Sequence, residues 1–163
     1  MIRVEGVVHR YGETTAVDGV DLTLPDGEYV VLAGPNGSGK TTLVRHLNAL
    51  LSPDEGRVLV NGVEATENPV AARTAVGMTF QDPRDGFVAA TVGADVAFGP
   101  ENLGLAHEEI DRRVGQARDA VNRRGREDER VDALAGGEQM RVAIAGARAM
   151  EPDHLILDEP FAG

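Results

Sequence analysis

The stretch GPNGSGKTT, from Gly34 to Thr42, contains Lys40, the only lysine in a chain of 163 residues. Gly34, Gly39, Lys40 and Thr41 fit the pattern G-x-x-x-x-G-K-[ST], in which glycines let backbone N–H groups curl around phosphates at a helix N-terminus. Every other basic residue is arginine. An ammonium fits a tight loop as a compact point charge, whereas a guanidinium is planar and wider. The spacing therefore predicts a phosphate-binding loop.

The loop implies a set of ligand contacts. Thr41 supplies a hydroxyl to Mg²⁺, and the loop groups expected to bind the phosphates are Asn36, Gly37, Ser38, Gly39, Lys40, Thr41 and Thr42. The alternative is a glycine-rich turn with a chance lysine. A phosphate loop alone leaves kinases, GTPases, motor ATPases and transport ATPases open.

A second motif, LILDEP, ends in two carboxylates. Asp158 follows a short apolar run, where it is placed to hold Mg²⁺ through water, and Glu159 is placed to polarise an attacking water. A charged pair that closes an ordinary strand is the alternative. Together with the phosphate loop, the motif indicates a nucleoside triphosphatase.

The spacing of apolar residues predicts the strands and helices that must position these groups. Alternation predicts strands in IRVEGVV, VDLTL and EYVVLAG, the last of them buried, and in AVGMTFQ. Helical spacing is found over 38–51 and in much of 84–150, including HEEIDRRVGQARDAVNRRG and GEQMRVAIAGARAM. Asn61-Gly62 predicts a hairpin, and HLIL predicts a buried parallel strand. Residues 122–132 are expected to form a solvated surface segment. The pattern predicts an α/β fold with an inserted helical subdomain.

The amino-acid composition limits the classes of partner that the protein is expected to bind. The chain has 27 acidic and 16 basic residues, a formal charge of −11, and no cysteine. An acidic surface repels phosphodiester backbones, so no nucleic-acid partner is expected. The absence of a long apolar run and of a secretory leader pattern predicts a protein of the cytoplasm.

The stretch LAGGEQMRVAIA makes the chain resemble the ATP-binding subunits of ABC transporters. Leu134, Ala135, Gly136, Gly137 and Glu138 occupy the positions of the family's Leu-Ser-Gly-Gly-Gln signature. The resemblance implies a P-loop NTPase core, with a largely parallel sheet and an antiparallel portion, and a helical subdomain. It also implies a head-to-tail dimer in which each signature binds the γ-phosphate of the ATP on the opposite subunit.

Other family positions match residue by residue. Tyr11 is similar to the aromatic residue that stacks on adenine, and Gln81 to the glutamine that senses Mg²⁺ and the attacking water. The segment Gln81–Leu105 resembles the energy-coupling-factor and cobalt-uptake group, whose ATPases receive coupling helices from a membrane subunit. Its apolar residues are expected to form either that groove or the core of the helical subdomain: Phe87, Val88, Val92, Val96 and Phe98.

The chain also departs from the family pattern. It stops at DEPFAG, where the family continues with a dimer-contact loop, further core strands and a switch histidine, so a C-terminally truncated core with poor stability is expected. The four histidines are expected to be ordinary surface or packing residues. Ala135 lacks the serine hydroxyl, and Glu138 places a carboxylate near a triphosphate.

The sequence therefore predicts one partial domain, 1–163, with an ATP-binding core at 1–81 and 151–163 and a helical subdomain at 82–150. The expected function is an ATP-hydrolysing subunit of a vitamin or metal-ion importer at the cytoplasmic face of the membrane. Its expected partners are a second ATPase subunit, a transmembrane coupling subunit and a substrate-capture subunit, with ATP and Mg²⁺ bound. The alternatives are a non-catalytic nucleotide-dependent interaction module, an inactive fragment, and an ABC ATPase that acts on DNA or ribosomes.

Overall fold

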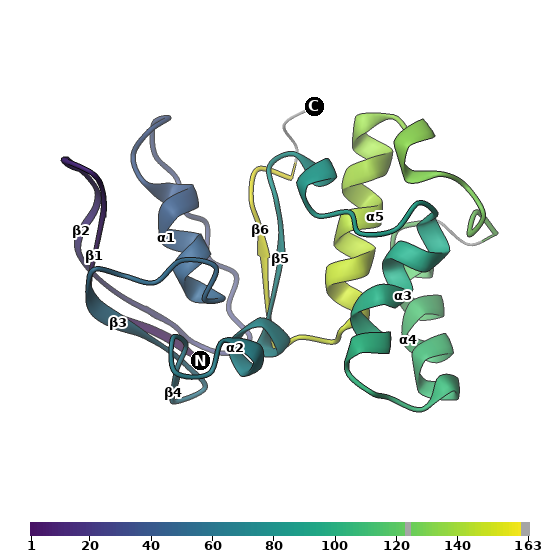
Figure 1. Cartoon of the computed structure of the whole chain (residues 1–163), viewed down its shortest axis with the longest axis horizontal. Coiled ribbons are helices and arrows are strands. Elements are labelled where there is room, and N and C mark those ends of the chain that lie inside the picture. Colours follow the sequence, from purple (N-terminus) through teal and green to yellow (C-terminus); the bar gives the residue numbers. More distant parts are fainter. Residues whose placement is uncertain (123–124, 161–163) are drawn as a thin grey trace. The chain divides into compact units, whose positions relative to one another are not determined.

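A computed structural model describes residues 1–122 and 125–160 and divides the chain into an N-terminal unit, Met1–Val76, and a C-terminal unit from Gly77 onward (Figure 1). In chain order the elements are β1 (Ile2–Tyr11), β2 (Thr14–Leu24), α1 (Lys40–Leu47), β3 (Glu55–Val60), β4 (Val63–Glu64), α2 (Pro69–Ala75), β5 (Val76–Thr79), the 3₁₀ turn η1 (Pro83–Asp85), α3 (Val92–Asn102), α4 (His107–Ala120), the 3₁₀ turn η2 (Val131–Ala133), α5 (Gly136–Ala149) and β6 (His154–Leu157). The predicted division at residues 81 and 151 stays a prediction.

The N-terminal unit is an antiparallel sheet with α1 packed on it. The strand order is β2-β1-β3-β4, and Ile2 at the start of β1 lies opposite Leu24 on one side and Val60 on the other. Leu43 and Leu47 of α1 are buried against the sheet, as a stripe of helical period requires. The buried apolar residues of the sheet are Ile2, Val4, Val7, Val8, Val17, Val58 and Val60.

The predicted hairpin is confirmed. Asn61 and Gly62 join β3 to β4 with φ angles of 52° and 83°. Both central residues of this turn need positive φ, a conformation that asparagine tolerates and glycine adopts freely. The Asn61-Gly62 turn therefore sets the register of the hairpin, in which Val60 lies opposite Val63.

The C-terminal unit is built on three helices that pack on one another (Figure 1). Their shared core contains Val92, Val96, Val114, Ala117, Val131, Leu134, Val142, Ala145 and Ala149. The buried carboxylate of Asp95 accepts the N–H groups of Val88 and Ala89 at 2.8 and 3.1 Å, and so fixes the loop before α3. Strands β5 and β6 form a separate two-stranded sheet.

Two predictions about buried strands are wrong. Residues 28–35, all described, form no strand, and the side chains of Tyr29 and Val31 are 103% and 89% exposed. Apolar character alone does not make a strand, because strand N–H and C=O groups need a paired neighbour. HLIL does form β6, but Leu155 and Leu157 stay about 40% exposed rather than buried.

Several boundaries also differ from the prediction. The helix expected over 38–51 ends at Leu47, and the chain then turns through Ala49, which has a φ of 56°. The strand expected in AVGMTFQ ends at Thr79, so Gln81 lies just beyond it. Within the described residues no helix has the length and apolar character needed to cross a membrane.

Residues 125–132 are only partly solvated, although a solvated surface segment was predicted for 122–132. Val131 is buried, and backbone groups of Glu127 and Glu129 accept the N–H groups of Gly93 and Val92, both at 2.9 Å. These bonds connect the segment to the start of α3. The arginines at positions 123 and 124 lie outside the described residues.

Candidate nucleotide-binding site

The loop from Gly34 to Gly39 has the backbone geometry that a phosphate cradle needs. Gly37 and Gly39 have φ angles of 80° and 87°, a region that residues with a Cβ rarely adopt. A Cβ on Gly34 would lie 2.9 Å from Ser38 Oγ, and a Cβ on Gly39 would overlap the carbonyl oxygen of Ala16. Gly39 is therefore required by both conformation and space, and Gly37 by conformation, whereas a Cβ on Gly34 would meet only the movable hydroxyl of Ser38.

Helix α1 starts directly after this loop, and no described side chain caps its N-terminus. Its N-cap residue is Gly39, and its first turn contains no acidic residue. An uncapped N-terminus carries partial positive charge from the N–H groups and the helix dipole. This end of α1 can therefore accept an anion without displacing a carboxylate.

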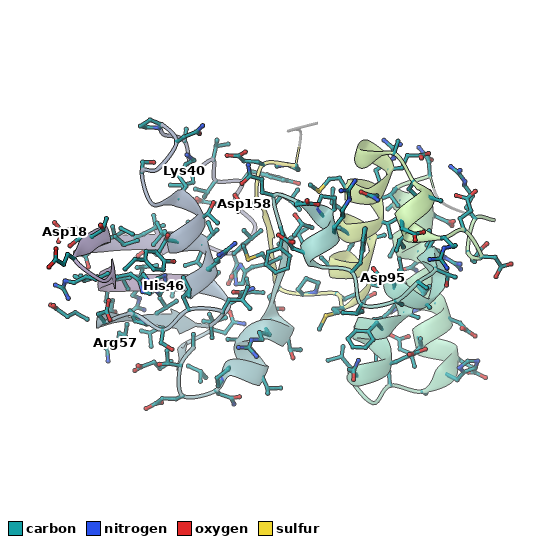
Figure 2. All side chains as sticks on the ribbon, turned by 45° about the horizontal axis from the view of Figure 1, so that its top comes forward. Asp18, Lys40, His46, Arg57, Asp95 and Asp158 are labelled. Atoms are coloured by element: carbon teal, nitrogen blue, oxygen red, sulfur yellow. The ribbon has the colours of Figure 1, made fainter. Side chains whose placement is uncertain are left out.

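Lys40 lies at the start of α1, where Figure 2 labels it. Its Nζ donates to the carbonyl oxygens of Gly34 and Pro35, each at 2.9 Å. An ammonium has three N–H donors, so these bonds hold the side chain over the loop and leave one donor for a ligand. The contacts agree with the role predicted for a compact ammonium inside the loop.

Two predicted metal donors belong to different units. Thr41 lies in the first turn of α1, whereas Asp158 directly follows β6 in the C-terminal unit. Hydroxyl, carboxylate and amide oxygens, the last from Gln81, are hard ligands of the kind that Mg²⁺ accepts together with water. The donor set fits Mg²⁺ chemically. Within the described residues no group of three or more His, Cys, Asp or Glu side chains could hold a metal ion.

The predicted adenine-stacking residue, Tyr11, is the last residue of β1 rather than part of a loop. Its side chain is 52% exposed, so one part of the ring is open to a ligand. The other part contacts His9, with ring centroids 4.6 Å apart and planes at 74°. Tyr11 is therefore an exposed aromatic residue whose position depends on a histidine.

In the C-terminal unit, two predicted catalytic groups come together. The amide Nε2 of Gln81 donates to Oε2 of Glu159 at 2.9 Å, across 78 positions of sequence. Glu159 has a φ of 48°, which is unusual for a residue with a side chain. The hydrogen bond restricts the orientation of the carboxylate, as a group that must align a water requires.

The signature residues open α5 as predicted. Gly136 and Gly137 are exposed, and no described atom outside their own helix lies within 4 Å of a Cβ built on either residue. The expectation that Glu138 places a carboxylate near a triphosphate stays a prediction, and the structure gives this carboxylate two partners. Its Oε2 accepts the N–H of Ala135 at 3.1 Å, and its Oε1 pairs with Arg126 at 3.2 Å. Ala135 has no hydroxyl, so only this half of a capping box can form.

The apolar residues after Gln81 divide between core and surface. Val92 and Val96 are fully buried, and Phe87 packs at the edge of the same core. Val88 and Phe98 are 59% and 47% exposed. The groove prediction therefore keeps only Val88 and Phe98 as candidates for contact with a partner.

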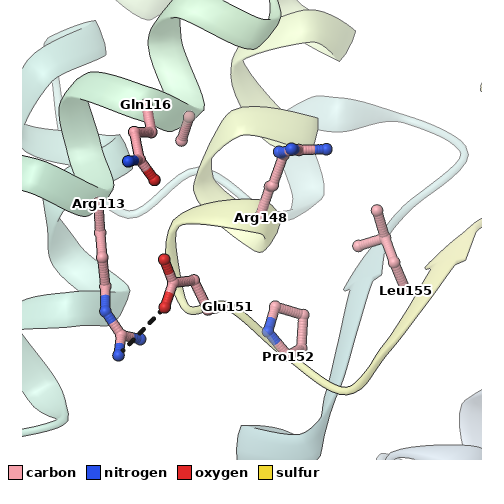
Figure 3. Close-up of a pocket in the computed structure, with 7 residues that line it drawn as sticks. Arg113, Gln116, Arg148, Glu151, Pro152 and Leu155 are labelled. Carbon is pink, nitrogen blue, oxygen red and sulfur yellow. Dashed lines mark ion pairs between the residues drawn. The ribbon is translucent and has the colours of Figure 1, made fainter.

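A pocket of about 280 Å³ lies elsewhere in the C-terminal unit (Figure 3). Arg113 in its wall is already held by Glu151 at 3.3 Å and by the carbonyl of Met150 at 2.9 Å. None of the predicted site residues lines this pocket. Its charged groups stabilise the junction of α4 and α5 rather than form part of the candidate site.

Sequence reasoning missed two contacts near the site. Arg126 was assigned to a solvated segment, yet it pairs with Glu138 at 3.2 Å. His9 and His46 were expected to be surface or packing residues; both are buried, but their contact with each other was not predicted. Both contacts join residues that are distant in sequence. No local pattern in the sequence predicts either contact.

Comparison with known proteins shows which family the chain belongs to. The sequence profile described as ABC transporter matches residues 17–162. A relative from Halobacterium salinarum that carries the name of an ABC transporter ATP-binding protein is 69% identical over 163 residues, which is all of this chain and 70% of that protein. An energy-coupling factor transporter ATP-binding protein of Symbiobacterium thermophilum is 49% identical over 172 residues and covers 99% of this chain and 60% of its own length.

A solved structure gives the same result for the fold. The cbiO1 structure from Clostridium perfringens, described as part of the ABC transporter complex cbiONQ, matches with a TM-score of 0.86 and 36% identity over 99% of this chain and 66% of that one. The chain thus spans about 60–70% of the length of these relatives. From the phosphate loop to the aspartate strand, the chain belongs to the ABC transporter family and has its P-loop fold.

Proposed function

We propose that the chain is the ATP-binding and ATP-hydrolysing part of a membrane importer of the energy-coupling-factor or metal-ion type. The observation that carries the proposal is the glycine loop, closed by Lys40, at the uncapped start of α1. The names of relatives support it, because they are ATP-binding proteins of energy-coupling-factor and cobalt importers.

Each residue has a defined task in this proposal. Lys40 and the loop amides bind the β- and γ-phosphates, while Thr41, Asp158 and Gln81 would hold Mg²⁺. When bound, Mg²⁺ would neutralise phosphate charge in the transition state. Glu159 accepts a proton from the attacking water, and the Gln81 amide keeps its carboxylate in position.

The remaining nucleotide contacts are proposed from the motif positions. Asn36, Gly37, Ser38 and Gly39 supply loop groups to phosphate, and Tyr11 stacks on adenine. The N-terminus of α5, from Ala135 to Glu138, faces the γ-phosphate of a nucleotide on a second ATPase subunit. Because Glu138 is turned back onto Ala135 and Arg126, its charge is partly neutralised and repels that phosphate less.

Further partners follow from the relatives and from exposed apolar residues. A transmembrane coupling subunit would contact Val88 and Phe98 at the cytoplasmic face of the membrane, beside a substrate-capture subunit. The name of the cbiONQ complex supports an assembly of this kind. Co-purification of the tagged protein with a co-expressed transmembrane subunit tests this, and we expect Val88→Asp with Phe98→Asp to abolish it.

Measurements of nucleotide binding and of steady-state ATP hydrolysis test the two main parts of the proposal separately. Lys40→Ala should weaken MgATP binding by about 100-fold or more, because a charge-assisted contact to phosphate is lost. Glu159→Gln should still bind MgATP but hydrolyse it about 100-fold more slowly or worse, which is the usual contribution of a general base. Glu101→Gln, an exposed glutamate on α3, is the matched control.

The results of these measurements distinguish an ATP-hydrolysing subunit from a non-catalytic module. Equal MgATP affinity of Lys40→Ala and the unchanged protein would overturn the phosphate-binding role. Ala135 gives a specific reason to test a non-catalytic module, because its side chain cannot donate to a γ-phosphate. Tight MgATP binding without turnover, even with a second ATPase subunit present, would establish that module instead.

A further inference from the structure

His9 and His46 form a buried pair inside the N-terminal unit. His9 lies on β1 and His46 on α1, six residues after Lys40 on the same helix (Figure 2). Their ring centroids are 4.8 Å apart, and the two residues are only 8% and 1% exposed. Two buried imidazoles in contact need an arrangement of protons that satisfies both rings.

The hydrogen bonds determine that arrangement. Nδ1 of His46 lies 2.7 Å from the carbonyl oxygen of Thr42, and a carbonyl only accepts, so Nδ1 must carry the proton. In the neutral ring Nε2 then has a lone pair and lies 3.2 Å from Nδ1 of His9. His9 must therefore donate from Nδ1. The bonds run in one direction, from His9 to His46 to Thr42.

Both ends of this chain of bonds touch the proposed nucleotide site. At one end the rings of His9 and Tyr11 form a T-shaped contact, with their centroids 4.6 Å apart. At the other end Thr42 lies in the first turn of α1, next to Thr41 and two residues from Lys40. The pair thus connects the exposed aromatic residue at the end of β1 with the helix turn that follows the phosphate loop.

We propose that His9 and His46 are positioning residues that hold Tyr11 in register with the phosphate-binding end of α1, and that they do so only while both rings are neutral. The proposal rests on the proposed function, since it concerns how the same nucleotide site is aligned. If Nε2 of His46 gained a proton, two N–H donors would face each other, one from Nε2 of His46 and one from Nδ1 of His9. The contact could then persist only if His9 changed tautomer around a buried charge.

The surroundings favour the neutral pair. Burial, the largest effect, lowers the pKa of His46 below its usual value of 6.5, and His9 lowers it further. Backbone groups of Thr42 and Ser52 and the carboxylate of Asp54 act in the opposite direction. The charged residues on α1 and on the three strands packed against it are Arg3, Glu5, Arg10, Asp18, Asp21, Lys40, Arg45, Glu55 and Arg57.

The test measures MgADP affinity by calorimetry between pH 5.5 and 7.5, on the protein and three variants. His46→Gln keeps a donor for Thr42 and an acceptor for His9 but cannot gain a proton. His46→Phe keeps an aromatic ring, somewhat larger than imidazole, and removes both bonds. His107→Gln replaces an exposed histidine on α4, so it controls for the loss of a histidine outside the pair.

We expect the affinity of the unchanged protein and of His107→Gln to fall by about 3- to 10-fold from pH 7.5 to 5.5, the size of one lost hydrogen bond. His46→Gln should bind as tightly at pH 7.5 and show no such fall. His46→Phe should be weaker by a similar factor at both pH values. A pH profile of His46→Gln identical to that of the unchanged protein would overturn the proposal.

Nitrogen-15 NMR of the imidazoles gives a readout that needs no nucleotide. Both rings should carry their proton on Nδ1 at pH 7.5, and detection of the Nε2–H tautomer in either ring would overturn the proposal. If the unchanged protein shows these tautomers but binds no MgADP, the proposed function fails while the geometry of the pair stands. Thermal unfolding by circular dichroism shows that each variant is folded before it is titrated.

Discussion

The conformation of Gly39 provides the sharpest test of the phosphate loop. Gly39→Ala forces a residue with a Cβ into a φ of 87°, which costs about 1–2 kcal/mol. The new methyl group would also overlap the carbonyl oxygen of Ala16 and lie 3.2 Å from its carbon. Crowding of this kind costs a further ~1–3 kcal/mol, because the backbone of β2 must move. The total expected loss is about 2–5 kcal/mol.

Gly37→Ala is the matched control for strain alone. Gly37 has a similar φ of 80°, but no described atom lies within 4 Å of a Cβ built on it. The difference between the two variants therefore isolates the contact with Ala16 and should be about 1–3 kcal/mol. With a urea m-value of about 1 kcal/mol/M for a unit of this size, Gly39→Ala should unfold about 1–3 M earlier than Gly37→Ala.

Tyrosine fluorescence makes the assay specific to one unit. Both tyrosines, Tyr11 and Tyr29, lie in the N-terminal unit, and the chain has no tryptophan. Gly115→Ala, on α4 with open space around its Cβ, should leave this signal unchanged and raise the stability of the C-terminal unit by about 0.5–1 kcal/mol. Equal urea midpoints for Gly39→Ala and Gly37→Ala would refute the close approach of loop and sheet.

Two further predictions concern the C-terminal unit. Hydrogen bonds from Arg112 and then Arg113 lower the pKa of Glu109 from 4.5 to about 2, so this stabilisation is present above pH 4.5 and is lost as the pH falls toward 2. Glu109→Gln should flatten that acid dependence in far-UV circular dichroism, and an unchanged acid profile would contradict it. Asp95→Ala should lower the free energy of unfolding by about 1–3 kcal/mol, because it leaves two part-buried N–H donors without their acceptor. Asp95→Asn keeps an acceptor oxygen and should lose less than about 1 kcal/mol by urea titration; equal losses for both variants would contradict this explanation.

The parts of the fold that sequence predicted best depend on contacts close in the chain. The Asn61-Gly62 hairpin needs two backbone conformations that its own residues supply, and α5 needs only its apolar stripe and its glycine start. The segment 28–34 has an equally clear strand composition, yet it forms no strand among the described residues. A strand depends on hydrogen bonds to a neighbour that its own sequence does not specify.

The candidate site divides in the same way. The phosphate loop is contiguous, so its pattern predicted both the glycine conformations and the place of Lys40. The hydrogen bond between Gln81 and Glu159 joins distant residues: the LILDEP motif predicted Glu159, whereas Gln81 was predicted from the family resemblance. The His9–His46 pair had no such pattern, because burial and pairing arise from packing that the sequence does not display.

The distribution of acidic residues over the helix starts gives an independent argument for the anion site. In a chain with 27 acidic residues, α3, α4 and α5 each have a carboxylate in the first turn, where it interacts favourably with the helix dipole. Helix α2 has no such carboxylate but is capped by the side chain of Asn68. Among the described α-helices, only α1 has neither an acidic first turn nor a side-chain cap. Since either would stabilise the helix by about 0.5–1 kcal/mol, their joint absence beside Lys40 fits a helix end whose partner is a bound phosphate.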